Sequence, residues 1–203
     1  MEIILVRHAQ SEGNAQGLYS GITDDNLTDL GKKQADQVAK YLAATLTKVE
    51  KVYSSPLVRA FDTAKLISKY LLLAEPELDN RLAEIDLGVW EGQPAQALEA
   101  SNSDLIEKWK EDPFEVEVPG AEKVNSVKSR IFEFCEEVSK MGLSRIVVVS
   151  HATVIHSLLI PLLGREGKEF WSIRIDNAGI SIIEWDSHPQ VISINQTEHL
   201  REA

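Results

Sequence analysis

The sequence of 203 residues predicts an α/β protein with a mostly parallel central sheet, helices on both faces of that sheet and a small inserted cap. Two runs, Glu2–Val6 and Arg145–Ser150, are apolar and β-branched without alternation, which is typical of parallel strands buried on both faces. Helical patterns separate these runs, and such alternation favours a parallel-rich sheet. Because no repeat, low-complexity segment or long linker divides the chain, we expect a single domain over residues 1–203.

The first half of the chain predicts two helices around a third strand. Apolar residues near helical spacing indicate a helix over Thr28–Leu46, with Thr28 as its N-cap. The weaker strand follows at Val49–Ser54. A second helix is then expected to begin at Ser55 and Pro56, since a capping residue followed by proline is typical of a helix start.

The second half begins with the predicted cap. Residues 92–120 hold several prolines and mostly acidic charges, and we expect short helices there rather than part of the sheet. An amphipathic pattern then predicts a helix over Val124–Val138, and another is expected over Val154–Leu163. Two β-like runs follow, Ser172–Asp176 and Ile180–Trp185.

Composition excludes several classes of protein. With 43% hydrophobic and 26% charged residues, the chain is an ordinary globular protein. A net charge of −11 argues against non-specific nucleic-acid binding. A site that binds phosphate would need a local cluster of positive charge within this acidic surface. No apolar stretch approaches the roughly 20 residues that span a bilayer, and the amino terminus is typical of a strand rather than a signal peptide. Since Cys135 is the single cysteine, no internal disulfide can form, and we expect a cytoplasmic protein.

Two histidines follow the two buried strands directly. His8 comes after Arg7, and His151 comes after Ser150. Ligands of open α/β sheets bind outside the carboxyl ends of strands, so both imidazoles should face one crevice. A single histidine there would more simply cap its strand, but two with an adjacent arginine favour a functional site. Arg59 falls in the opening turn of the second predicted helix, where a cation is unfavourable unless it meets an anion or turns to solvent.

Five motifs in order resemble those of the histidine phosphatase (phosphoglycerate mutase-like) superfamily. They are Leu-Val-Arg-His-Ala-Gln-Ser-Glu-Gly-Asn ending at Asn14, Leu27-Thr28-x-x-Gly31-x-x-Gln34-Ala35, Ser54-Ser55-Pro56-Leu57-x-Arg59-Ala60-x-x-Thr63-Ala64, Leu82-x-Glu84-x-x-x-Gly88-x-Trp90-Glu91-Gly92 and Val149-Ser150-His151. The resemblance runs from Ile3 to about Trp185. It implies the phosphoglycerate mutase-like fold and a phosphohistidine mechanism that needs no metal or cofactor.

The resemblance also implies roles for the residues near the strand ends. His8 would be the nucleophile that forms the phosphohistidine. Arg7 and Arg59 would fork onto phosphoryl oxygens, while His151 would donate to an oxygen as charge spreads in the transition state. Because the neighbouring cations disfavour imidazolium, the pocket itself should keep His8 neutral and ready to attack.

Other positions carry weaker expectations. Glu84 would be the general acid and then the base for water, with Asp86 as a rival that would share its face if the segment were a strand. Asn14, Ser20 and Gly21 match positions that touch phosphate or substrate in the family, although a simple loop role remains open.

The chain departs from the family at two positions. Ala9 and Ala152 follow the two histidines where glycine is usual, and alanine would be costly if either backbone had a positive φ. We expect both to be tolerated. The remaining histidines, His156, His188 and His199, are expected to have no catalytic role.

Several functional alternatives stay open at this point. A phosphoglycerate-type mutase shares the same core, a zinc hydrolase could use the histidines, and an inactive relative could bind phosphorylated ligands. A phosphatase for a small phosphorylated metabolite is the favoured hypothesis, because mutases of the family tend to be longer. The acidic cap favours a substrate with an amine or neutral end, which makes phosphoserine a leading candidate beside sugar phosphates and ribazole phosphate. If Ile180–Trp185 were an exposed edge strand, it could pair two copies into a homodimer.

Overall fold

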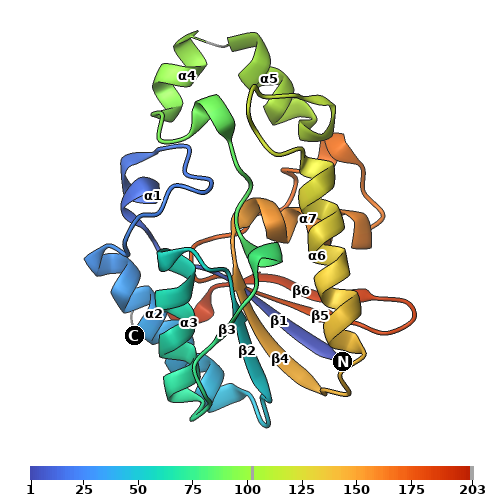
Figure 1. Cartoon of the computed structure of the whole chain (residues 1–203). Helices are drawn as coiled ribbons and strands as arrows, with labels where there is room; N and C mark the ends of the chain where they lie inside the picture. Colours follow the sequence, from blue (N-terminus) through green and yellow to red (C-terminus); the bar gives the residue numbers. More distant parts are fainter. Residues whose placement is uncertain (102, 202–203) are drawn as a thin grey trace.

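The structure is a computed structural model that describes residues 1–101 and 103–201. Parts of two predictions, the cap at 92–120 and the domain at 1–203, fall on residues 102, 202 and 203, which lie outside the described residues. Within the described part, a six-stranded sheet in the order β3-β2-β4-β1-β5-β6 forms the centre of the molecule (Figure 1). No described helix has both the length and the apolar character needed to cross a membrane.

The sheet is mixed but mostly parallel, which confirms the predicted fold class. Its central pair is β1 with β4, in a register that sets Arg7 opposite Ser150. On one side β4 continues in parallel to β2 and then β3, and on the other side β5 and β6 are added antiparallel. The strands are β1 (Glu2–Arg7), β2 (Lys51–Ser54), β3 (Glu77–Leu78), β4 (Arg145–Ser150), β5 (Ile180–Glu184) and β6 (Gln190–Gln196).

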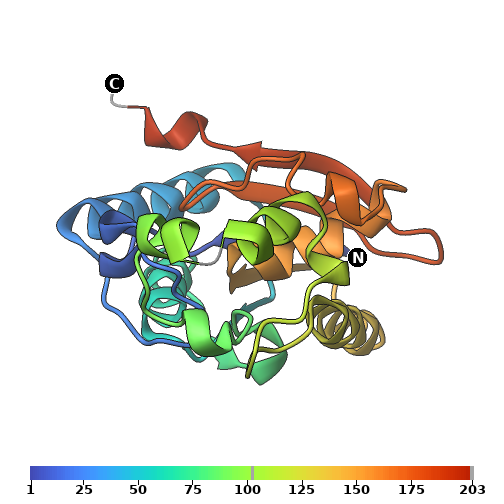
Figure 2. The same cartoon turned by 90° about the horizontal axis from the view of Figure 1, so that it is seen from above.

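Helices cover both faces of the sheet, as expected (Figure 2). Alternate residues of β1 divide between the two layers, so that Ile4 and Val6 belong to the core under α2 and α3, whereas Ile3 and Leu5 belong to the core under α6 and α7. The four covering helices are α2 (Asp29–Thr45), α3 (Val58–Tyr70), α6 (Val124–Ser139) and α7 (Ala152–Leu162). Thr28 caps α2 as predicted, since its hydroxyl accepts the N–H of Gly31 at 2.9 Å.

Shorter helices lie beyond the carboxyl ends of the parallel strands. They are α1 (Glu12–Gln16), α4 (Ala95–Ser101) and α5 (Ser103–Glu111), of which α4 and α5 fall within the predicted cap (Figure 1). Trp109 of α5 anchors this region, because its ring meets Trp90 edge-on with centroids 5.7 Å apart and lies 6.1 Å from Trp171. The carboxyl ends of β1 and β4, which His8 and His151 follow, therefore face this layer.

The start of α3 differs from the prediction. The helix begins at Val58 rather than at Pro56, and Leu57 stands at the cap position without a side-chain hydrogen bond. The hydroxyl of Ser55 accepts the N–H of Leu57 at 3.2 Å in a local turn instead. The free N–H of Val58 is bound at 2.7 Å by Asp24, which comes from a distant loop.

The carboxyl-terminal third also corrects two expectations. Ser172–Asp176 forms no strand, because carbonyl groups of this segment accept hydrogen bonds from the side chains of Arg7 and His156 rather than from a neighbouring strand. The run predicted at Ile180–Trp185 does form β5, but β5 is an inner strand between β1 and β6. The edge on this side is β6, and the sequence patterns predicted neither β6 nor β3 at the opposite edge.

Candidate active site

The two strand-end histidines lie against each other. Because β1 and β4 are paired in parallel and in register, His8 and His151 leave the sheet side by side, and the backbone N–H of His8 donates to Ser150 O at 2.9 Å. Their ring centroids are 5.0 Å apart, with the planes tilted by 55°. Both side chains are buried, at 3% and 0% exposure. The structure thus brings the predicted pair together.

The environment of His8 keeps its ring neutral. Nδ1 lies 2.7 Å from Ala9 O, so this nitrogen carries the proton and Nε2 keeps its lone pair. Burial lowers the pKa of His8 well below its usual value, and the charges of Arg7 and Arg59 lower it further. An unprotonated Nε2 in a positively charged pocket is the state that a nucleophile requires.

One ring nitrogen of His151 has a hydrogen-bond partner, and the other is buried without one among the described residues. Its Nε2 lies 2.7 Å from the Ser55 hydroxyl. Its Nδ1 is buried and has no hydrogen-bond partner among the described residues. Burial is the main cause that lowers the pKa of His151 well below its usual value, followed by the neighbouring His8, Arg59 and Arg7. A buried polar atom without a partner costs about 1–3 kcal/mol, and a ligand that binds this nitrogen would remove that cost.

Arg7 shows the same feature. Its Nη1 donates to Ile175 O at 2.7 Å, which fixes the direction of the guanidinium group. Its Nε is buried and has no partner in the described part of the chain. Burial lowers the pKa of Arg7, while the nearby carboxylates of Glu84 and Asp176 oppose this effect. Arg7 ends β1 opposite Ser150, the residue before His151, so the two atoms without partners come from neighbouring strand ends, and an anion would satisfy Arg7 Nε and a protonated His151 Nδ1.

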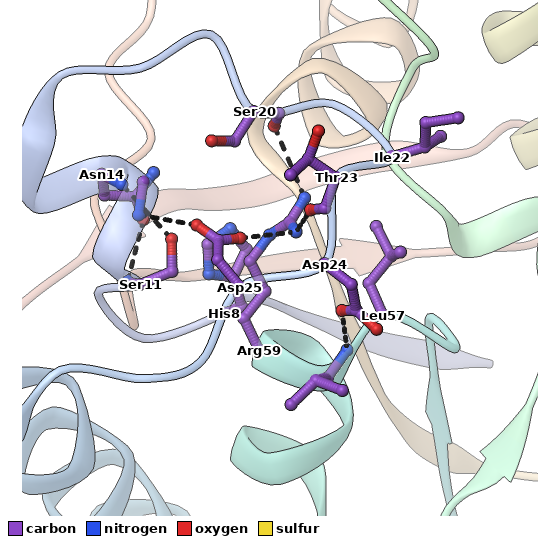
Figure 3. Close-up of polar contacts among 12 residues, drawn as sticks. His8, Ser11, Asn14, Ser20, Ile22, Thr23, Asp24, Asp25, Leu57 and Arg59 are labelled. Atoms are coloured by element: carbon purple, nitrogen blue, oxygen red, sulfur yellow. Dashed lines mark hydrogen bonds and ion pairs between the residues drawn. The ribbon is translucent and has the colours of Figure 1, made fainter. Parts of the chain in front are cut away.

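The terminal nitrogens of Arg59, which we expected to fork onto phosphoryl oxygens, are bound by protein groups in this structure. Its side chain is only 1% exposed and lies under the loop of residues 20–25, close to His8 (Figure 3). Nη1 donates to Thr23 O at 2.7 Å and pairs with Asp25 Oδ1 at 3.1 Å, while Nη2 donates to Gly21 O at 2.6 Å. The loop thus takes up the terminal nitrogens in this structure.

Glu84, rather than Asp86, joins the buried cluster. Its Oε1 accepts the N–H of Ile85 at 2.9 Å, and its Oε2 accepts the N–H of Thr153, in the first turn of α7, at 3.2 Å. Burial raises the pKa of Glu84, and these hydrogen bonds together with nearby arginines only partly oppose the rise. Asp86 instead accepts the N–H of Gly88 at 2.8 Å, and neither carboxylate lies on a strand.

The remaining predicted residues form the surrounding loops. Asn14 accepts the N–H of Ser11 at 3.2 Å as part of a capping box and also accepts from Asn177 Nδ2 at 2.9 Å. Ser20 and Gly21 belong to the loop over Arg59. Their carbonyl groups accept hydrogen bonds from Arg59, and their contact with substrate stays a prediction.

The alanines after the histidines are unstrained. Neither Ala9 nor Ala152 has a positive φ, so the concern raised by the missing glycines does not apply. His156 is a packed residue of α7, whose ring stacks on Phe170 with centroids 5.3 Å apart. In the part of the chain that is described, no group of three or more His, Cys, Asp or Glu side chains could hold a metal ion.

The sequence patterns missed several residues of the site. Asn177 donates to His8 O at 3.0 Å, Asp25 pairs with Arg59, and the Ser55 hydroxyl holds His151. Glu91 binds the loop over Arg59. Only Ser55 and Glu91 fall within the quoted motifs, so motif membership was the one signal that could have found them.

Comparisons with known proteins agree with this geometry. The sequence pattern of the histidine phosphatase superfamily (branch 1) matches residues 3–197. Phosphoserine phosphatase 1 of Hydrogenobacter thermophilus is 38% identical over 204 aligned positions, which cover 100% of this chain and 95% of that protein. A 2,3-bisphosphoglycerate-dependent phosphoglycerate mutase of Thermoplasma acidophilum is 32% identical, with 89% and 86% covered. A mutant phosphoserine phosphatase of Entamoeba histolytica, solved in complex with phosphoserine, superposes with a TM-score of 0.85 at 30% identity, with 98% and 99% covered.

Proposed function

Because the chain belongs to branch 1 of the histidine phosphatase superfamily and is a phosphomonoester hydrolase that acts through a phosphohistidine, we propose that His8 carries the phosphoryl group and that phosphoserine is the substrate. The observation that supports the site assignment most strongly is the buried His8–His151 pair, beside which Arg7 Nε and His151 Nδ1 have no partner among the described residues.

In the proposed reaction His8 Nε2 attacks phosphorus in line, and the bond from phosphorus to the serine oxygen breaks. Glu84 gives its proton to that oxygen, so that neutral serine leaves. Water then attacks the phosphohistidine while Glu84 takes back a proton, which releases inorganic phosphate and restores His8. Arg7 and His151 stabilise the negative charge of the phosphoryl oxygens in both steps, and the positive charge of Arg59 beside His8 contributes to binding of the phosphoryl group.

The raised pKa of Glu84 supports its proposed double role. Burial keeps a larger share of this carboxyl protonated near neutral pH than an exposed carboxyl would be. A general acid needs that proton in the first step, and the resulting carboxylate can serve as a base in the second step.

The phosphoserine proposal depends on the relatives rather than on the acidic cap. Glu99 and Glu117 are exposed and pair with Lys110 and Lys123, so these two carboxylates are partly neutralised at the surface. These two carboxylates therefore give little reason to expect a substrate with an amine. The similarity to phosphoserine phosphatases over the whole chain remains.

A matched pair of substrates tests the proposal. Phosphoserine and 3-phosphoglycerate differ only in an amine against a hydroxyl, so the release of free phosphate from each measures recognition of the amine. We expect the higher kcat/KM for phosphoserine, and a preference for 3-phosphoglycerate or for a sugar phosphate would reject it as the substrate. Conversion of 3-phosphoglycerate to its 2-phospho isomer, dependent on a bisphosphate primer, would instead favour a mutase.

The nucleophile is tested separately by trapping the phosphoenzyme. The wild-type protein should form an acid-labile phosphohistidine, and His8→Ala should form none and turn over no substrate. His188→Ala is the matched control, because His188 is an exposed histidine. Full turnover by His8→Ala would reject the assignment.

We also propose that the chain is one domain with a cap at 92–120, that it works in the cytoplasm, and that it forms a homodimer. The lone cysteine, Cys135, supports a reducing compartment. The dimer would pair the β6 edge, where Ile192 is 57% exposed, rather than β5. Sedimentation equilibrium tests the dimer, and a monomer at all concentrations would contradict it.

A further inference from the structure

The carboxylate of Glu91 binds a loop beside the histidine pair. Its Oε1 accepts the backbone N–H groups of Ile22 and Leu87, both at 2.9 Å. Its Oε2 accepts those of Gly21 and Thr23, both at 3.2 Å, and the Thr23 hydroxyl at 2.6 Å. Burial alone would raise the pKa of Glu91, but these hydrogen bonds outweigh it and lower the pKa. Glu91 is therefore a carboxylate whose acceptor sites are all used by one loop and its neighbour.

The same loop turns its carbonyl groups toward Arg59. Gly21 O and Thr23 O accept from the two terminal nitrogens of the guanidinium at 2.6 and 2.7 Å. Asp25 adds an ion pair and is itself held by the N–H of Gly13 at 2.7 Å (Figure 3). The loop thus lies between an anion and a cation, with its N–H groups on one and its carbonyl groups on the other. Hydrogen bonds in such a chain polarise and strengthen one another.

The packing around this arrangement is close. A Cβ added at Gly21 would lie 2.1 Å from Ile85 O and 2.2 Å from Glu91 Oε1, so only glycine allows the loop to approach the carboxylate. The start of the loop has a second attachment that does not use Glu91, since Tyr19 O accepts from Gly92 at 2.8 Å and Tyr19 N donates to Gln93 O at 2.9 Å. Replacement of Glu91 should therefore free residues 21–23 without detaching the whole segment.

We propose that Glu91 is a positioning residue for the phosphoryl site, which acts by holding the loop of residues 21–23 so that its carbonyl groups fix the guanidinium of Arg59 beside His8. Glu91 touches none of the reacting atoms. The inference rests on the proposed function in one respect only, namely that Arg59 contributes to binding or transfer of the phosphoryl group.

A double-mutant cycle between Glu91 and Arg59 tests the inference. In Glu91→Gln an amide NH2 group faces backbone N–H donors, so hydrogen bonds to a charged acceptor are lost. We expect kcat/KM with an aryl phosphate to fall roughly tenfold to a hundredfold, and competitive inhibition by inorganic phosphate to weaken. In an Arg59→Ala background the same change should have less than about a threefold effect, because the residue on which it acts is gone.

Two further variants keep the test decisive. Glu99→Gln is the control, because Glu99 is an exposed cap glutamate that pairs with Lys110, and it should leave kcat/KM unchanged. Thr23→Val removes only the hydroxyl bond to Glu91, so it should give a smaller loss that also disappears without Arg59. If Glu91→Gln does not fold, the Thr23→Val cycle decides alone.

The outcomes separate this inference from the proposed function. Losses that simply add in the cycle, or wild-type kinetics in Glu91→Gln, would overturn the positioning role. Wild-type kinetics in Arg59→Ala would instead overturn the proposed role of Arg59 at the phosphoryl site, and with it the premise of the inference.

Discussion

Replacement of Glu84 by glutamine is a direct test of the proposed acid–base chemistry. The buried carboxyl group is held by the N–H groups of Ile85 and Thr153. Glutamine keeps the size and one acceptor oxygen, but it has no proton to transfer, and its NH2 group opposes the N–H of Thr153. Loss of a general acid costs about 10²–10⁴ in rate, which corresponds to about 2.7–5.4 kcal/mol of barrier.

The size of the loss should depend on the leaving group. The serine oxygen of phosphoserine needs a proton as it leaves, whereas the phenolate of p-nitrophenyl phosphate is stable without one. We therefore expect the full loss of kcat/KM with phosphoserine and a loss at least about tenfold smaller with the aryl substrate. Steady-state release of phosphate and of nitrophenol measures the two.

The pH profile gives a second readout of the same group. Because burial raises the pKa of Glu84 above its ordinary 4.5, the protonated acid persists above that pH. Wild-type kcat/KM for phosphoserine should then decline as pH rises through the raised pKa, and Glu84→Gln should lack this decline. Asp86→Asn is the matched control and should keep the wild-type profile. Equal losses on both substrates, or an equal effect of Asp86→Asn, would refute the reasoning.

Two further predictions concern stability. His8 and His151 have folded-state pKa values below the ordinary 6.5, so the unfolded chain binds more protons, and the stabilisation present above pH 6.5 is lost as pH falls below it. At one pH unit below 6.5 the free energy of unfolding should be lower by on the order of 1 kcal/mol per histidine. Urea unfolding at two pH values should therefore show a smaller decrease in this free energy for His8→Gln than for the wild type. An equal decrease in the two proteins would contradict this. Gly88→Ala should destabilise by roughly 2–4 kcal/mol, because φ is +55° and a Cβ would lie 2.3 Å from Pro119 O. Gly17→Ala, with φ +64° and nothing within 4 Å, should cost only about 1–2 kcal/mol in the same assay, and equal costs would show that the contact with Pro119 does not matter.

Local sequence patterns predicted the elements that keep one pattern of burial along their whole length. The strands β1 and β4 are continuous apolar runs because both of their faces are buried, and the stripe of α6 follows from its single buried face. Pairing with a distant strand is not written locally. For this reason the sequence left open an edge position for β5, which the structure places between β1 and β6.

The start of α3 also depends on a distant residue that local sequence patterns do not include. Ser55 and Pro56 have the local sequence of a helix start, but the first free N–H group, on Val58, is satisfied by Asp24, which is 34 residues away in the chain. The hydroxyl of Ser55 is used instead by the turn and by His151. A capping rule based on neighbouring residues cannot account for a hydrogen-bond partner that comes from a distant part of the chain.

By itself, the sequence determined that His8 and His151 meet at one edge of the sheet, because each follows a strand that must be buried and the carboxyl ends of neighbouring parallel strands coincide. Only the tertiary structure decided which of their nitrogens remain without a partner and what holds Arg59. The partners of Arg59 and His151 come from segments 34 to 96 residues away, and hydrogen bonds between such segments depend on how the whole chain packs.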